Sequence, residues 1–187
     1  GKPTARPSAL RWVRTLFHLC PKAPPPPLSR SAGPATYCGL RQIRVKDESQ
    51  RLGLQGFKAL GGVYAIFELV SRAAERQFGH PVAASELLSP QVLSISREMT
   101  FVCASDGNHG RSVAAGARLV GARCVVFLHR GVSEQRAKWI TTLGASVVRF
   151  EGTYDESVEA AQETARDRSW TLVADTTNST DDDVPGL

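Results

Sequence analysis

The 187-residue sequence predicts an α/β fold of parallel β-sheets with flanking helices. Three observations in its second half lead to this class. Short apolar runs recur at roughly regular intervals, segments of helical length separate them, and a glycine directly follows two of those segments. Strand, helix and strand in this order are typical of crossover connections in a parallel sheet.

The elements of the second half can be placed individually. The apolar runs predict four strands, at residues 99–104, 124–128, 146–150 and 171–174. The intervening segments predict helices at residues 108–120, 133–143 and 154–168. Gly121 and Gly144 fall where a helix C-terminus favours a left-handed residue. Together these elements predict a doubly wound layer, followed by a polar tail at 176–183.

The first half has a weaker pattern. Residues 1–40 are expected to be mostly irregular, apart from a short helix at 12–19. Residues 40–46 alternate enough to form a strand, and 47–56 form a polar loop. A helix follows at residues 60–74, because its apolar residues step by three and four positions along one stripe.

Charge is distributed unevenly along the chain. Residues 1–46 hold nine Lys or Arg and no Asp or Glu, which leaves a net charge of −4 for the rest of a chain whose total is +5. We interpret this proline-rich beginning as an arm over the protein surface. A transit peptide or an anionic partner are the alternatives. The segment shows no single face on which basic residues are interleaved with aromatic ones, so nucleic-acid binding is not expected.

The sequence gives no reason to expect a membrane protein, a disulfide-stabilised protein or a metal-binding protein. No apolar run is long enough to span a membrane, so we expect a cytoplasmic protein, with a mitochondrial location as the alternative that the basic beginning raises. The four cysteines are too scattered for a disulfide framework or a metal site. Cys103 and Cys124 are expected to be reduced core residues.

Residues 105–110, S-D-G-N-H-G, follow a predicted strand and open a predicted helix. Free backbone N–H groups and the helix dipole favour an anion there, such as a carboxylate or phosphate. The alternative is an ordinary strand-to-helix turn that Asp106 or Asn108 caps.

Residues 56–62, G-F-K-A-L-G-G, place Lys58 at an apolar helix start among glycines. A lysine in such surroundings can be nucleophilic and form a Schiff base, whereas the alternative is an ordinary surface lysine. Gly61 and Gly62 are expected to permit the close approach of another group.

Together these segments resemble a known family. K-D-E-S at 46–49, F-K at 57–58 and the loop at 105–110 resemble the pyridoxal-phosphate (PLP) enzymes of the tryptophan synthase β-like type, fold type II, which include serine and threonine dehydratases. The resemblance implies that Lys58 bears PLP and that Asn108 lies near the cofactor's 3′-oxygen. It also implies that the backbone amides of residues 105–109 bind the substrate carboxylate.

Within the family the chain most resembles the diaminopropionate ammonia-lyases, over most of residues 12–177. The segment at 46–54 is similar to theirs, Gly56 replaces the serine usual in dehydratases, and Asp106 replaces a small neutral residue. The resemblance implies the α,β-elimination of 2,3-diaminopropionate to pyruvate and ammonia. Lys58 and Asp106 would be the catalytic bases on opposite faces of the substrate, which would admit both L and D forms.

Asp106 and Asp175 are further expected to hold the second ammonium of this substrate, and His109 to be structural. The expected substrate-binding residues are Ser105, Asp106, Gly107, Asn108, His109 and Asp175.

The family's later phosphate-binding loop has no match in this sequence, so we expect the N-terminal half of a longer enzyme. Residues 1–85 would form an arm and part of the large PLP domain, 86–180 a small α/β domain, and 181–187 the start of a continuing segment. The full-length protein is expected to be a homodimer, and the 187-residue chain alone to bind PLP poorly and to be inactive. Two alternatives stay open: a PLP-dependent serine or threonine dehydratase, and a non-catalytic fragment that pairs with a full-length subunit.

Overall fold

The computed structural model describes residues 9–20, 25–54 and 56–175. Its centre is a four-stranded parallel sheet in the order β5-β4-β3-β6. All five residues of β3 are buried, as expected for a central strand that is covered on both faces. The four strands are β3 (Thr100–Ala104), β4 (Arg123–His129), β5 (Ser146–Phe150) and β6 (Thr171–Leu172).

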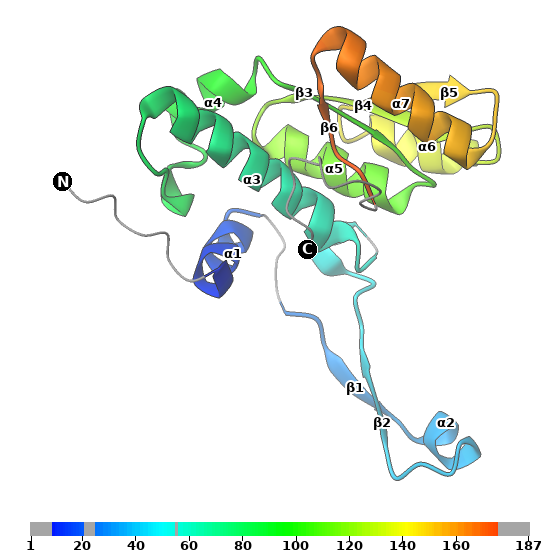
Figure 1. Ribbon diagram of the computed structural model, residues 1–187. Helices are drawn as coiled ribbons and strands as arrows, with labels where there is room; N and C mark the ends of the chain where they lie inside the picture. The colour runs from blue at the N-terminus through cyan, green and yellow to red at the C-terminus, as the bar shows by residue number, and fades with distance from the viewer. Residues whose placement is uncertain (1–8, 21–24, 55, 176–187) are drawn as a thin grey trace.

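Helices cover both faces of this sheet (Figure 1). Alternate residues of β3 point to opposite faces, because side chains alternate along a strand. Phe101 belongs to the cluster that includes α5 (Asn108–Leu119), whereas Val102 packs with Ala161 of α7 (Tyr154–Arg168). The third helix, α6 (Glu134–Thr141), contacts β5 and α5. The predicted doubly wound arrangement is therefore confirmed.

The long helix α3 (Ala59–Phe78) packs on α5 and positions the start of the site. A Cβ at Gly62 would lie 2.5 Å from Oγ of Ser112, so only glycine allows this approach. Ser112 Oγ donates to the carbonyl of Ala59 at 2.7 Å and accepts from the N–H of Val63 at 3.1 Å. The predicted close approach is thus confirmed at Gly62.

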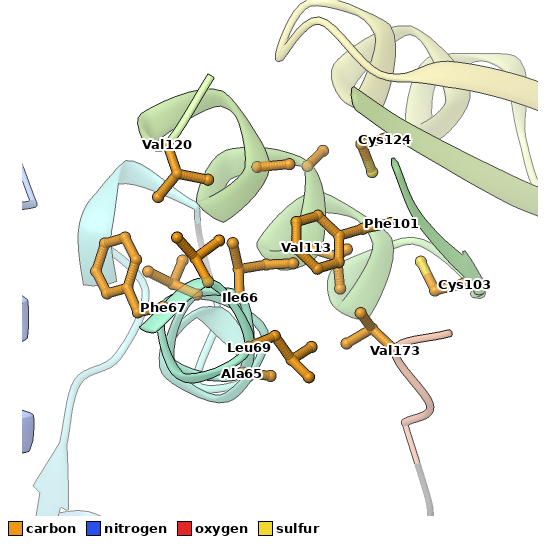
Figure 2. Close-up of a cluster of buried hydrophobic side chains, with 14 of the residues drawn as sticks. Ala65, Ile66, Phe67, Leu69, Phe101, Cys103, Val113, Val120, Cys124 and Val173 are labelled. Atoms are coloured by element: carbon orange, nitrogen blue, oxygen red, sulfur yellow. The ribbon is translucent and has the colours of Figure 1, made fainter. Parts of the chain in front are cut away.

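The core lies between α3, α5 and the sheet. Figure 2 shows Ile66 and Leu69 of α3 in one cluster with Val113 of α5 and Phe101 of β3. Phe101 and Ile66 are fully buried. This cluster fixes α3, and therefore Lys58 at its N-cap position, against the sheet that carries the loop at 105–107.

The prediction that residues 1–40 are mostly irregular was wrong for residues 28–37. They form β1 (Leu28–Ser31) and the short helix α2 (Ala32–Tyr37), and β1 pairs antiparallel with β2 (Ile43–Lys46). This hairpin projects from the body in Figure 1. Its side chains are largely exposed, with Tyr37 at 93%. A strand held by backbone pairing, with little burial on either face, carries no apolar alternation to reveal it.

Other boundaries differ by a few residues. The first helix, α1 (Ala9–His18), begins earlier than expected, and β6 is shorter. Helix α4 (Pro90–Ser96) was not predicted, although Ser89 caps it and proline occupies its first turn. Gly121 and Gly144 have φ of 70° and 90°, which confirms both as left-handed helix ends. The 3-10 turns are η1 (Arg51–Gly53) and η2 (Ala84–Glu86).

Cys103 and Cys124 are free and buried, as expected. Among the described residues, no cluster of His, Cys, Asp or Glu could hold a metal ion. In the same residues, no helix has the length and apolar character needed to cross a membrane. The tail at 176–183 and the segment 181–187 lie outside the described residues, and the expected division at residue 85 stays a prediction.

Candidate active site

The loop between β3 and α5 is organised by Ser105. Its buried Oγ accepts hydrogen bonds from the N–H groups of Gly107 at 2.9 Å and Gly110 at 2.8 Å. Gly107 occupies the N-cap position of α5 and has no side chain that could cap the helix. Asp106 and Asn108 are therefore not the caps of this helix. Helix capping uses neither of their side chains.

Gly107 has the backbone geometry that this loop requires. Its φ of 136° lies in a region that L side chains rarely adopt. A Cβ there would also stand 3.2 Å from Cδ of Arg136. The same Arg136 donates from Nη1 to the carbonyl of Asp106 at 3.1 Å. An arginine from α6 thus closes over the loop and holds its backbone.

The amine of Lys58 meets the end of β6. Its Nζ lies 2.5 Å from Oδ2 of Asp175, and the Lys58 side chain is 40% exposed. The two residues are far apart in sequence, but the start of α3 and the carboxyl end of β6 adjoin in the fold. Among the predicted site residues, this pairing joins the expected cofactor lysine to the expected ammonium-binding carboxylate.

His109 lies on the first turn of α5 and faces the same segment. Its Nε2 donates to the carbonyl of Val173 at 2.9 Å, while Nδ1 lies 3.7 Å from Oδ1 of Asp175. Burial lowers the pKa of His109 below its usual value, although the Val173 carbonyl and Asp175 oppose this effect. These contacts are those of a neutral imidazole that connects α5 to the segment after β6.

The segment K-D-E-S-Q-R at 46–51 folds as a turn with internal polar contacts. Glu48 pairs with Arg51 at 2.6 Å and with Lys46 at 2.9 Å. The hydrogen bonds from Arg51 and then Lys46 lower the pKa of Glu48 to about 2. Asp47 accepts from the N–H of Ser49 at 2.9 Å. The motif that supports the family resemblance is therefore stabilised by its own ion pairs and hydrogen bonds.

Two residues that line the pocket, Arg136 and Tyr154, were not predicted as site residues from the sequence, and neither was His129 beside them. His129 Nε2 lies 2.9 Å from Oδ1 of Asp106. Burial, followed by the charges of Asp175 and Asp106, raises the pKa of Tyr154, so its phenol stays protonated. The contact between His129 and Asp106 follows from the pairing of β3 with β4. Ala104 pairs with Phe127, and Asp106 and His129 each come two positions after one of these paired residues.

A pocket of about 220 Å³ brings these groups together. It is polar and carries two basic and two acidic side chains. A second hollow of about 300 Å³ adjoins it and shares Lys58, His109 and Asp175. The lysine amine therefore lies where a flat ligand in one hollow could meet a small polar ligand in the other. The described residues that line the first pocket are Lys58, Ser105, Asp106, Asn108, His109, Arg136, Tyr154 and Asp175.

Comparison with known proteins finds similar enzymes. A family model described as "Pyridoxal-phosphate dependent enzyme" matches residues 21–183. The diaminopropionate ammonia-lyase of Escherichia coli is 36% identical over 154 residues, which cover 81% of this chain and 37% of that enzyme. A probable D-serine dehydratase of Sinorhizobium medicae is 30% identical over 67% of this chain and 29% of its own length.

A solved structure is similar as well. The E. coli diaminopropionate ammonia-lyase in complex with D-serine superposes with a TM-score of 0.79 at 32% identity, covering 91% of this chain and 43% of that one. The expected resemblance and the type II fold are therefore confirmed. The chain spans less than half the length of each of these relatives.

Proposed function

Since this chain belongs to the family of pyridoxal-phosphate-dependent enzymes, we propose that its pocket performs the α,β-elimination of 2,3-diaminopropionate to pyruvate and ammonia. One observation carries the proposal: the amine of Lys58 opens into the same pocket as the carboxylates of Asp106 and Asp175. An amine can bind an aldehyde cofactor covalently. Two carboxylates suit a substrate that bears two ammonium groups.

The residues present fit pyridoxal phosphate. Lys58 would hold it covalently, because its partly exposed amine borders both hollows. Asn108 would lie beside its 3′-oxygen. When bound, the cofactor supplies an electron sink for negative charge at the substrate's α-carbon. Lys58 would have to break its ion pair with Asp175 before it could bind the cofactor. The ion pair is therefore a feature of the protein without cofactor.

The substrate carboxylate would be bound by backbone amides of the loop. The N–H groups of Gly107 and Gly110 are already used by Ser105. The N–H groups of Asp106 and Asn108 have no hydrogen bond in the described part of the chain. These two amides, with that of His109 at the positive end of α5, are the donors that remain for an anion.

Proton transfer would use two groups. Lys58, once free of the cofactor, would remove the α-proton of one enantiomer, and Asp106 that of the other. Asp175 would bind the ammonium that leaves as ammonia. Water then completes the balance, since one diaminopropionate and one water give one pyruvate and two ammonia molecules.

The test is a substrate panel on the longest natural protein that contains these residues, called the long form below. Pyruvate and 2-oxobutyrate are measured from both enantiomers of diaminopropionate, from serine and from threonine. We expect diaminopropionate to be turned over with the highest kcat/KM. A higher value for serine or threonine would contradict the proposal.

The 187-residue chain is tested separately. We expect weak PLP binding and no measurable turnover, because a large part of the relatives' length has no counterpart in it. Stoichiometric labelling of Lys58 after borohydride reduction, in this chain alone, would overturn that expectation. Association with the long form without activity would instead favour the non-catalytic fragment.

A dehydratase is the second candidate. The similarity to a probable D-serine dehydratase favours it, as does the relative whose structure contains D-serine. Serine has a neutral hydroxyl as leaving group, so it gives Asp106 and Asp175 no second cation to bind. The substrate panel separates the two candidates directly.

Three further features belong to the proposal. We expect the long form to be a homodimer, which light scattering measures. We expect a cytoplasmic location, with the basic residues 1–46 leaving a mitochondrial one as the alternative, which fractionation measures. We also keep the division into 1–85 and 86–180, and limited proteolysis should cut near residue 85 before it cuts elsewhere.

A further inference from the structure

His129 ends β4 beside the loop that follows β3, and its ring faces the carboxylate of Asp106. Nε2 of His129 lies 2.9 Å from Oδ1 of Asp106. The Asp106 side chain is 67% exposed and the His129 side chain 23%. An exposed carboxylate is ordinarily free to rotate, so a partner that is itself held in place determines where it points.

The contacts of the ring define its tautomer. The N–H of Gly131 points at Nδ1 of His129 over 3.1 Å. A backbone N–H can only donate, so Nδ1 must carry the lone pair. In the neutral ring the proton is therefore on Nε2, which donates it to Asp106. The negative charge remains on Asp106.

The ring itself is held on other sides. A Cβ at Gly131 would lie 2.7 Å from Cε1 of His129, so glycine allows the backbone to turn beneath the ring. The Tyr154 ring meets His129 edge-on, with centroids 6.3 Å apart and an interplanar angle of 89°. Since Arg136 also binds the carbonyl of Asp106, both the backbone and the side chain of that residue have fixed partners.

The two carboxylates of the pocket thus have different partners. Asp175 is paired with the cation of Lys58, whereas Asp106 accepts from a neutral donor. A neutral donor orients a carboxylate without cancelling its charge. Oδ1 is engaged by His129, which leaves Oδ2 for a substrate proton or ammonium.

We propose that His129 is a positioning residue, which holds Asp106 through an Nε2–H hydrogen bond so that Oδ2 faces the substrate. The contact is a property of the chain itself, but its effect on turnover rests on the proposed function. His129 does not touch the reacting atoms. It acts through Asp106.

The first experiment needs no cofactor. The ring nitrogens of His129 are observed by NMR in the ¹⁵N-labelled chain and assigned by their loss in His129→Phe. We expect a neutral ring with the proton on Nε2 in neutral buffer, and a changed Nε2 resonance in Asp106→Ala. A charged ring, a proton on Nδ1, or ring-nitrogen resonances that do not change in Asp106→Ala would overturn the proposal.

The second experiment uses the long form with PLP. His129→Phe keeps a ring against Tyr154 but lacks the donor, and His129→Gln keeps a donor. We expect His129→Phe to lower kcat at least about tenfold for the enantiomer that depends on Asp106, as for losing a hydrogen bond to a charged group. We expect the other enantiomer to change less and His129→Gln to restore part of the loss.

The matched control is His80→Phe, because His80 stacks on Phe78 away from the pocket and should change nothing in turnover. Equal loss for both enantiomers, or no loss in His129→Phe, contradicts the positioning role. If the unmodified long form shows no turnover at all, the proposed function fails. The nitrogen resonances then still decide whether His129 orients Asp106.

Discussion

Nζ of Lys58 and Oδ2 of Asp175 lie 2.5 Å apart, although 117 positions separate the two residues in sequence. The pair joins the N-cap of α3 to the segment that follows β6. It brings the amine expected to hold the cofactor against a carboxylate expected to hold the substrate.

Replacing Lys58 by arginine should abolish covalent attachment of PLP while sparing the fold. Arginine keeps the positive charge beside Asp175 but cannot form the bond to the aldehyde. Because the pair is partly exposed, the free energy of unfolding should change by less than about 1 kcal/mol. Borohydride reduction with peptide mass analysis of the long form measures attachment. Labelling elsewhere in Lys58→Arg at full stoichiometry would identify another lysine as the anchor.

Asp106→Asn should remove the turnover of D-diaminopropionate and retain most of that of the L form. An amide cannot accept the α-proton, whereas Lys58 remains for the other face. Pyruvate release from each enantiomer measures the effect in the long form. Asp155→Asn, on the first turn of α7, is the control. Equal loss for both enantiomers would show that Asp106 binds substrate without acting as the base.

Asp175→Asn should raise the KM for diaminopropionate about tenfold or more, because a hydrogen bond to a charged group is lost. Serine has no second ammonium, so its KM should change less. Steady-state kinetics of both substrates in the long form measure the difference. An equal change for both would assign Asp175 to holding Lys58 rather than the substrate.

Gly62→Ala should destabilise the chain by about 1–3 kcal/mol, the usual cost of overpacking. The new Cβ would lie 2.5 Å from Oγ of Ser112 and 2.9 Å from the backbone N of Val113, so both helices must shift. Urea denaturation measures the effect. Gly33→Ala is the matched control, since nothing lies within 4 Å of its added carbon. A Gly62→Ala chain as stable as the parent would mean that α3 and α5 separate easily.

Cys38 should react with maleimide in the folded chain, whereas Cys103 and Cys124 should react only after unfolding. Cys38 is exposed and the other two are buried. Burial raises the pKa of Cys124 to about 12 and that of Cys103 well above its usual value. The reactive thiolate is therefore scarce at neutral pH in both. Mass analysis of labelled peptides at increasing pH checks this order.

Much of the fold of the second half could be predicted, because its signals lie in residues that are close together in the sequence. Strands β3 to β5 and helices α5 to α7 bury apolar side chains with a regular period, which the sequence displays directly. Gly121 and Gly144 mark helix ends for an equally local reason. Strand β1 buries little and left no comparable pattern, whereas the alternation of residues 40–46 did predict a strand where β2 forms.

Some residues of the candidate site could likewise be predicted from local motifs, and others could not. The motifs around Lys58 and at residues 105–110 identified the family and named most of the pocket residues. His129 was missed because a lone histidine at a strand end has no distinctive neighbours in sequence. Its contact with Asp106 arises only once β3 and β4 pair in register.

Local sequence patterns predicted the order of strands and helices in the second half, the glycines at helix ends and the motifs around Lys58 and Asp106, because each depends on residues close in the chain. The contacts of Lys58 with Asp175, of Ser105 with the first turn of α5, and of His129 with Asp106 could be found only in the folded chain. Such contacts depend on strand register and helix packing, which bring distant residues within hydrogen-bonding distance.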